Sequence, residues 1–249
     1  MIKSFPPFTQ SAYINMKESG YIIHEGTKNG SKFVVIATLK TSNKKTGNMI
    51  QLWILLSDHS PVDGVKSGLD ASTICTGCKF ASGEGCYVNV GQAPNSIWKS
   101  YKKGNYFKLD PFLYDSVFNG RKVRFGAYGN PSLIPLSIIK LITESCNGWT
   151  GYFHDWKEMS KERASAYGSY FMASTETNDS VRRAKEKNLR YFHVSPEQPE
   201  DTVECLADSK GLTCDQCELC KGNRIGAKSI WINPHGSKKK RAIEQAISN

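Results

Sequence analysis

The chain has none of the features that direct a protein into or across a membrane. It contains no run of about 18 consecutive apolar residues, and residues 1–10 lack the apolar stretch of a signal peptide. We therefore expect a cytoplasmic protein with no membrane partner. Because the cytosol keeps thiols reduced, the eight cysteines should serve mainly as ligands for iron–sulfur or zinc centres and should not form a disulfide framework.

Several catalytic motifs are missing as well. There is no Gly-x4-Gly-Lys-Ser/Thr phosphate loop and no Gly-x-Ser-x-Gly elbow, which argues against P-loop nucleotidases and α/β-hydrolases. No His-hydrophobe-His pair is present for a rolling-circle nickase. Acidic residues are the scarcer charge, since 33 Lys and Arg against 23 Asp and Glu give a net charge of +10. This excess favours a polyanionic partner such as nucleic acid.

The pattern of apolar residues predicts an α/β fold. Two β-rich runs, residues 32–39 and 49–56, flank a polar turn and predict an N-terminal β-hairpin. From residue 110 short strand-like runs alternate with helical spacing, and such βα units build a parallel sheet, which we expect to form a partial (βα) barrel. The expected strands are 122–127, 151–154, 169–173, 190–194 and 228–233, and the expected helices are 96–102, 110–118, 136–145, 157–167 and 179–187.

The chain divides into two parts near Pro196 and Pro199, where the alternation stops. Residues 1–199 should form the partial barrel with its hairpin, and residues 200–249 a cysteine-rich metal-binding segment with a basic tail. Residues 57–105 show little periodicity, so we expect a long functional loop there, with one short helix.

The strongest metal signal is Cys205-x8-Cys214-x2-Cys217-x2-Cys220, with His235 further on. Four thiolates within sixteen residues can surround one ion or cluster. The polar neighbours of these cysteines argue against thiols that are simply buried. Zinc and a [4Fe–4S] cluster accept the same four thiolates, so the spacing leaves the metal open.

A second group of cysteines, Cys75-x2-Cys78-x7-Cys86, lies in the expected long loop. Three protein ligands leave one coordination position open, which distinguishes a catalytic metal from a structural one. The alternative is a structural zinc site closed by a fourth ligand, such as His59, Cys146 or a C-terminal cysteine. If Cys146 is not this fourth ligand, we expect it only to contribute to packing.

Polar residues follow four of the expected strands. The carboxyl ends of parallel strands line the ligand crevice of a βα sheet, so these residues should converge on one site. The alternative is that some of them only cap the following helices. The candidates are Tyr128, Gly129, Asn130 and Ser174 for cofactor binding and His154, Asp155 and Glu176 for catalysis, with Thr175, His193 and Ser195 nearby.

The order of motifs resembles that of radical S-adenosylmethionine enzymes. The segments VRFGAYGNPSLIP, GYFHDW and YFMASTET follow a three-cysteine loop and precede a terminal cysteine cluster. The resemblance implies a partial barrel, a [4Fe–4S] cluster, S-adenosylmethionine as cosubstrate and an auxiliary cluster. That family usually has Cys-x3-Cys-x2-Cys and a glutamate where this chain has Asn130. Residues 70–240 also resemble a family of bacteriophage and mobile-element proteins that has no established activity.

Three functions are consistent with these features. The leading hypothesis is an iron–sulfur enzyme of phage origin that acts on nucleic acid or a nucleobase with a small-molecule cosubstrate. The second is a zinc-stabilised nucleic-acid-binding or base-exchange protein resembling tRNA-guanine transglycosylases, with Asp155 or Glu176 as nucleophile or base. The third is a non-enzymatic module for phage replication or host takeover. Its nucleic-acid surface would combine aromatic residues Trp98, Tyr101 and Tyr106 with the basic tail at residues 238–241.

Overall fold

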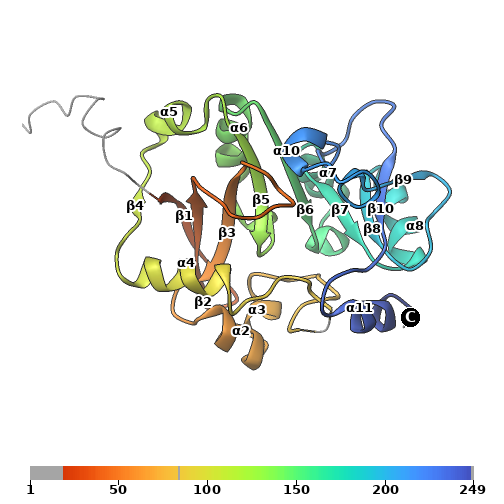
Figure 1. The fold of residues 1–249 in the computed structure, drawn as a ribbon, viewed down its shortest axis with the longest axis horizontal. Coiled ribbons are helices and arrows are strands. Elements are labelled where there is room, and N and C mark those ends of the chain that lie inside the picture. The colour runs from red at the N-terminus through yellow and green to blue at the C-terminus, as the bar shows by residue number, and fades with distance from the viewer. Residues whose placement is uncertain (1–18, 84, 248–249) are drawn as a thin grey trace, which may run out of the picture.

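The computed structural model describes residues 19–83 and 85–247, and a ten-stranded sheet lies at its centre (Figure 1). The strands are β1 Gly20–Lys28, β2 Ser31–Thr38, β3 Ile50–Leu56, β4 Phe107–Lys108, β5 Lys122–Tyr128, β6 Gly148–Phe153, β7 Met172–Thr175, β8 Tyr191–Val194, β9 Thr202–Glu204 and β10 Ser229–Ile232. Their order is β4-β1-β2-β3-β5-β6-β7-β8-β10-β9. The β1–β2 and β2–β3 pairs are antiparallel and the other pairs are parallel. The predicted α/β class with a mostly parallel sheet is confirmed.

The predicted hairpin is present as β2 and β3, which pair from Phe33 opposite Leu56 to Thr38 opposite Gln51. The sequence analysis missed β1, which extends this hairpin to three antiparallel strands. Asn29 and Gly30 form the turn between β1 and β2 with φ of 50° and 78°. Both residues adopt the left-handed conformation that a two-residue hairpin turn requires.

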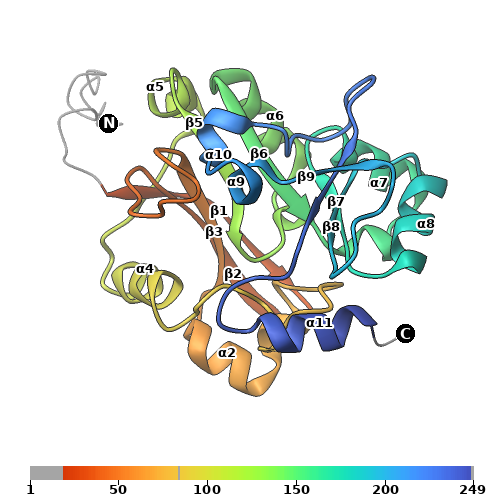
Figure 2. The ribbon, with the colours of Figure 1, turned by 45° about the vertical axis from the view of Figure 1, so that its right-hand side comes forward.

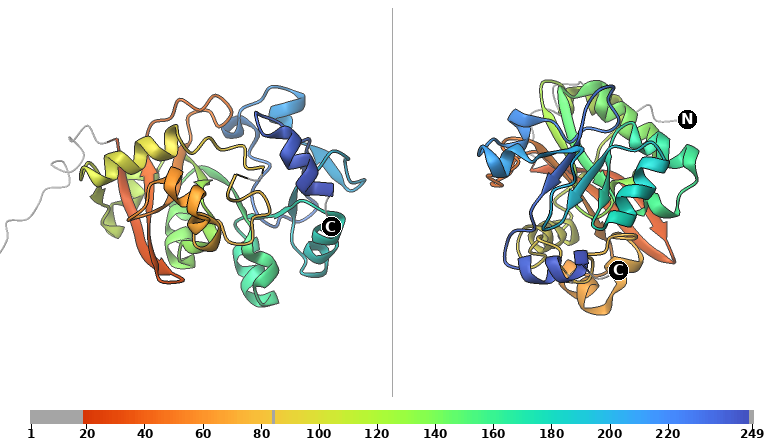
Figure 3. Two further views of the ribbon diagram at one scale, coloured as in Figure 1. Left: turned by 90° about the horizontal axis from the view of Figure 1, so that it is seen from below. Right: turned by 90° about the vertical axis from the view of Figure 1, so that its right-hand side faces the viewer.

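Helices α6 Leu136–Ser145, α7 Lys161–Gly168 and α8 Asn178–Glu186 connect the parallel strands and lie on one face of the sheet (Figure 3, left). We call this the helix face. Ile139 and Ile142 of α6 are fully buried there in the same apolar cluster as Phe125 of β5. The elements expected between residues 110 and 194 are all present; α6 has the predicted bounds and the others have shifted ends. Helix α7 begins later than predicted because Ser160 caps it by accepting a hydrogen bond from the Arg163 backbone N–H.

The opposite face of the sheet is covered by the cysteine-bearing segments, and we call it the loop face. Helices α9 Leu206–Ser209 and α10 Cys214–Cys217 lie toward one end of the strands, and α11 Lys239–Ile247 lies toward the other (Figure 2). Residues 200–249, expected to be a separate segment, contribute β9 and β10 to the same sheet.

The stretch 57–105 is more ordered than predicted. It contains α2 Pro61–Ser67, α3 Leu69–Ser72 and α4 Ala93–Lys102, where the sequence suggested one short helix. The capping residues of α2 define it more clearly than any apolar periodicity does. Ser60 accepts a hydrogen bond from the Asp63 N–H at the start of the helix, and Gly68 ends the helix with φ of 73°. Before β5 the chain forms the short helix α5 Tyr114–Phe118.

Within the described ranges, no helix is both long enough and apolar enough to cross a membrane. Residues 1–10, whose composition argued against a signal peptide, lie outside the described residues.

Candidate functional site

Nested turns bring the three loop cysteines to one cavity. The Cys78 N–H donates to the Cys75 carbonyl at 3.1 Å, and the Cys86 N–H donates to the Phe80 carbonyl at 3.0 Å. The second of these bonds folds the chain back, so that the x7 spacing returns Cys86 to the other two cysteines. All three residues line the cavity, which encloses about 140 Å³.

Asn130 joins this loop to the strand ends. Its N–H donates to the Ile74 carbonyl at 2.7 Å, and its side-chain amide donates to the Thr76 carbonyl at 3.4 Å. Its side-chain oxygen accepts a hydrogen bond from the His154 backbone N–H. Gly77 packs so closely that a Cβ atom there would lie 2.6 Å from the His154 carbonyl oxygen. The expected cofactor-binding residue Asn130 therefore lies behind the cavity wall and positions the loop.

Four other candidates line the cavity with the cysteines. Tyr128 ends β5 and Gly129 follows it, His154 follows β6, and Ser174 belongs to β7. Residues from three separate βα units thus meet the cysteine loop at the carboxyl ends of their strands.

His154 presents an unused ring nitrogen in this region. Its Nδ1 is buried and has no hydrogen-bond partner among the described residues. Burial is the largest cause that lowers the pKa of His154 to about 4, and Asp155 opposes this shift. The imidazole is therefore neutral at physiological pH, and its Nδ1 can form a hydrogen bond or ligate a metal.

The two carboxylates proposed for catalysis do not line the cavity, and each has partners of its own. Asp155 accepts a hydrogen bond from the Ser132 hydroxyl at 2.7 Å and lies 3.6 Å from Lys28 Nζ. Glu176 pairs with Lys157 Nζ at 3.0 Å. Burial raises the pKa of Glu176, and Lys157 opposes this shift. Both carboxylates hold the strand ends in place in this structure.

The thiols lie within electrostatic reach of one another. Burial raises the pKa of Cys75, and Cys78, Asp70 and Cys86 raise it further. Thiolates this poorly solvated need a cation beside them. Within the described part of the chain, no three His, Cys, Asp or Glu side chains are arranged to hold a metal ion. The three thiols fit a soft metal in their chemistry and shared cavity, and ligation requires their side chains to turn toward one centre.

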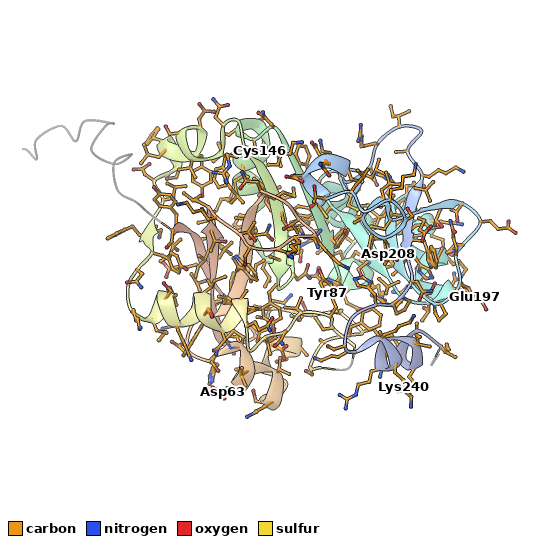
Figure 4. All side chains as sticks on the ribbon, in the orientation of Figure 1. Asp63, Tyr87, Cys146, Glu197, Asp208 and Lys240 are labelled. Atoms are coloured by element: carbon orange, nitrogen blue, oxygen red, sulfur yellow. The ribbon has the colours of Figure 1, made fainter. Side chains whose placement is uncertain are left out.

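The fourth ligands considered for a closed zinc site lie elsewhere. His59 is exposed in the turn after β3 and does not line the cavity. Cys146 donates to the Gly148 carbonyl at 3.4 Å, and Figure 4 labels it near the upper edge, away from Tyr87 at the centre. Sequence analysis missed Asp70, a buried carboxylate on the cavity wall that accepts a hydrogen bond from the Tyr128 hydroxyl. No motif marks it.

The C-terminal cysteines are held by three different parts of the fold. The Cys205 N–H donates to the Trp231 carbonyl of β10 at 2.8 Å, and the Cys214 N–H donates to the Lys45 carbonyl at 2.8 Å. The Cys220 carbonyl accepts from Gly151 of β6. Burial raises the pKa of Cys205, and Cys214 and Cys217 raise it further, so these thiols also lie near one another. Their role as metal ligands remains a prediction.

A second cavity of about 350 Å³ adjoins the first. Tyr87, Arg124, Tyr152, Phe192 and the expected ligand His235 line both cavities. Cys205 and Cys214 line the second cavity, so the two cysteine groups lie on either side of these shared walls.

The basic tail and the expected aromatic platform are parts of the folded structure. Lys238 lines the first cavity, and Arg241 of α11 donates to the Gly83 carbonyl in the cysteine loop. Trp98 donates its indole N–H to the Leu56 carbonyl at 3.0 Å, and Tyr106 is buried. Trp98 and Tyr106 are therefore engaged in the fold, Tyr101 is half-buried, and a nucleic-acid surface here remains a prediction.

Comparison of the chain with protein-family models, with curated proteins and with solved structures found no match.

Proposed function

We propose that this chain is an iron–sulfur enzyme similar to the radical S-adenosylmethionine enzymes, with Cys75, Cys78 and Cys86 as cluster ligands. One observation carries the proposal: these three cysteines line the same cavity as residues from the ends of β5, β6 and β7. A [4Fe–4S] cluster with three protein ligands has one open iron, which would bind S-adenosylmethionine or a related cosubstrate and supply an electron.

The chain's own residues would bind and orient the cosubstrate. His154 offers its free Nδ1 as a hydrogen-bond acceptor beside the cysteines. The Tyr128 and Ser174 side chains are polar groups on the same wall, and Gly129 lets the cosubstrate approach the backbone. Asn130, Asp155 and Glu176 are positioning residues in this proposal, because their polar atoms hold the loop and the strand ends.

We also propose that the sheet is the wall of a partial (βα) barrel. Strands β3, β5, β6, β7 and β8 are neighbours in the order in which they occur along the chain. In such a barrel the helices lie outside and the ligand binds at the carboxyl ends of the strands. The position of α6, α7 and α8 on one face supports this assignment (Figure 3, left).

A zinc-stabilised base-exchange enzyme is the second candidate, favoured by the aromatic walls of the second cavity. In this case Cys205, Cys214, Cys217 and Cys220 would hold structural zinc. Its nucleophile would have to be a carboxylate that leaves its present partners, since Asp155 and Glu176 are both engaged. The iron–sulfur proposal needs no such rearrangement of these carboxylates.

The test is the metal content and visible spectrum of protein purified without oxygen. We expect brown wild-type protein with iron, and a spectrum that changes when S-adenosylmethionine is added. Cys78→Ala should remain folded and lose one of two centres, while the control Cys146→Ala should keep both. Protein that contains zinc and no iron, or a Cys78→Ala variant with unchanged iron, would contradict the iron–sulfur proposal.

A further inference from the structure

The floor of the second cavity is polar where a sheet face would normally be apolar. Gln51 of β3 is the register partner of Arg124 of β5, and Arg124 is the register partner of Thr150 of β6. These three side chains are only 1%, 5% and 1% exposed. Burial of three polar side chains in one row costs free energy unless their hydrogen bonds are satisfied.

Gln51 is not fully satisfied. Its side-chain N–H groups donate to the Thr46 hydroxyl at 2.9 Å and to the Met49 carbonyl at 3.1 Å. Its Oε1 is buried and has no partner among the described residues. Rotating the amide by half a turn would place Oε1 against the Met49 carbonyl oxygen, so the present orientation is fixed. Gln51 therefore has an unpaired acceptor, which a hydrogen-bond donor on a ligand in the cavity that this residue lines can satisfy.

Arg124 offers the complementary groups. Its guanidinium lies over the Tyr152 ring, 4.3 Å from the centroid, and its contact to the Thr150 hydroxyl is long at 3.5 Å. It also approaches the hydroxyls of Tyr87 and Tyr152. No ion pair among the described residues joins it to a carboxylate. A guanidinium has five N–H donors and no acceptor, so it can also donate to an acceptor on a ligand.

The walls of this cavity are aromatic. Tyr152 and Phe192 are stacked with centroids 4.2 Å apart, and Trp53 and Tyr87 complete the lining. Figure 4 labels Tyr87 and the rim residue Asp208 near the middle of the molecule. Phe192 and Arg124 cover the two faces of Tyr152, so Tyr87, which is 58% exposed, is the ring on which a flat ligand can stack while its edge hydrogen-bonds to the polar floor.

We infer that the second cavity binds a nucleobase, with an N–H of the base donating to Gln51 Oε1 and a neighbouring carbonyl or ring nitrogen accepting from Arg124. This inference deepens the proposed function by naming the substrate class. The base can arrive as a nucleoside or within a single strand, because both present the same edge. The site rejects rings whose edge carries no N–H, since Gln51 Oε1 would then stay unpaired.

The experiment measures equilibrium binding to the anaerobically purified protein by calorimetry. The ligands are guanosine, adenosine, cytidine and uridine, a single-stranded RNA of mixed sequence, and caffeine as a planar ring without an N–H. We expect at least one nucleoside or the RNA to bind and caffeine not to bind. RNA binding without nucleoside binding would identify a polynucleotide as the source of the base.

Matched variants assign the binding to the cavity floor. Gln51→Leu should weaken binding about tenfold to a hundredfold through the lost hydrogen bond, with the melting temperature unchanged or raised. Gln198→Leu, at an exposed position outside both cavities, should bind like wild type. Arg124→Met removes the guanidinium donors, and it should weaken binding in the same way.

Binding of neither nucleoside nor RNA, or equal binding by wild type and a folded Gln51→Leu variant, would overturn the inference. Iron content is measured on the same samples. Protein that contains iron but binds no base refutes this inference alone, whereas base binding by protein without iron refutes the iron–sulfur proposal alone.

Discussion

The two faces of the sheet are stabilised in different ways. On the helix face, apolar side chains of α6, α7 and α8 pack on the strands as part of the main apolar cluster. The loop face carries buried polar residues, thiols and cavities, and short helices and turns cover it. A protein built in this way can concentrate its stability on one face and leave the other face free for chemistry. The comparison predicts that metal removal destabilises the loop face and leaves the helix face intact.

The largest expected effect is at the C-terminal cysteines of the loop face. Four-ligand thiolate coordination of structural zinc contributes on the order of 10 kcal/mol to folding. Cys217→Ala should therefore lose one metal centre, lower the melting temperature strongly and reduce solubility. Cys146→Ala is the control. Unchanged metal stoichiometry and an unchanged melting temperature in Cys217→Ala would remove the assignment of metal to this segment.

On the helix face a smaller loss is expected, and it should not depend on metal. Ile142 is fully buried, so Ile142→Ala should lower the free energy of unfolding by about 2–5 kcal/mol through lost burial and a cavity. Leu141, its neighbour, is 41% exposed, and Leu141→Ala should cost much less. Chemical denaturation and metal analysis of both variants provide the check. Metal loss in a folded Ile142→Ala variant would contradict the expectation that the two faces are stabilised independently.

His193 should make stability depend on pH. It is buried, contacts Thr175 Oγ1 through Nδ1 at 2.9 Å, and packs edge-on against Tyr191, a member of the core of the helix face. Burial lowers the pKa of His193 to about 4, against 6.5 for free histidine. Between these values the unfolded chain binds a proton that the folded chain does not. The free energy of unfolding is therefore highest above pH 6.5 and falls as the pH drops, by up to about 3 kcal/mol.

Denaturation of wild type and His193→Gln at pH 7.5, 6 and 5 isolates this contribution, because every other histidine is present in both proteins. We expect the stability difference between them to change across this range. Parallel pH profiles for the two proteins would show that the pKa of His193 is the same in the folded and the unfolded chain.

The smallest expected effect is at the contact between the cysteine loop and β6. Gly77 has φ of 77°, and a Cβ there would also lie 2.7 Å from the Asp155 Cα, so Gly77→Ala combines backbone strain with a clash. Gly30 has φ of 78° and no atom within 4 Å of such a Cβ, so Gly30→Ala carries the strain alone. We expect Gly77→Ala to cost about 1–3 kcal/mol and to disturb the proposed metal site, and Gly30→Ala to cost less. Equal losses in melting temperature would show that the loop does not depend on this contact.

The regular part of the fold could be predicted because its signals are local. Helix α6 has the predicted bounds, since the apolar spacing from Leu136 continues to its end. Strand β1 was missed because two glycines and the polar pair His24 and Glu25 interrupt its apolar pattern. The turn Asn29–Gly30 was the signal that could have identified it.

The candidate site was predictable only in part. The cysteine spacings and the strand-end rule indicated residues that the structure gathers around one cavity, including Cys75, Tyr128 and His154. Neither rule could identify Gln51 and Arg124, which face each other across β3 and β5 although 73 positions separate them in the sequence. A buried polar pair of this kind depends on strand register, and no local pattern encodes which residues become partners.

The last strand of the chain has a consequence for protein synthesis. β10 lies between β8 and β9 in the sheet, and the Cys214 N–H donates to the Lys45 carbonyl. Residues near the end of the chain therefore complete the structure around residues near its beginning. Ribosomes add about 5–20 residues per second, and N-terminal parts of a chain emerge first. A growing chain would therefore expose Gln51 and Trp53 for about 8–36 s before residues 205–232 cover them. The metal proposed for the C-terminal cysteines could bind only after this delay, so the loop face would be the last part of the protein to be completed.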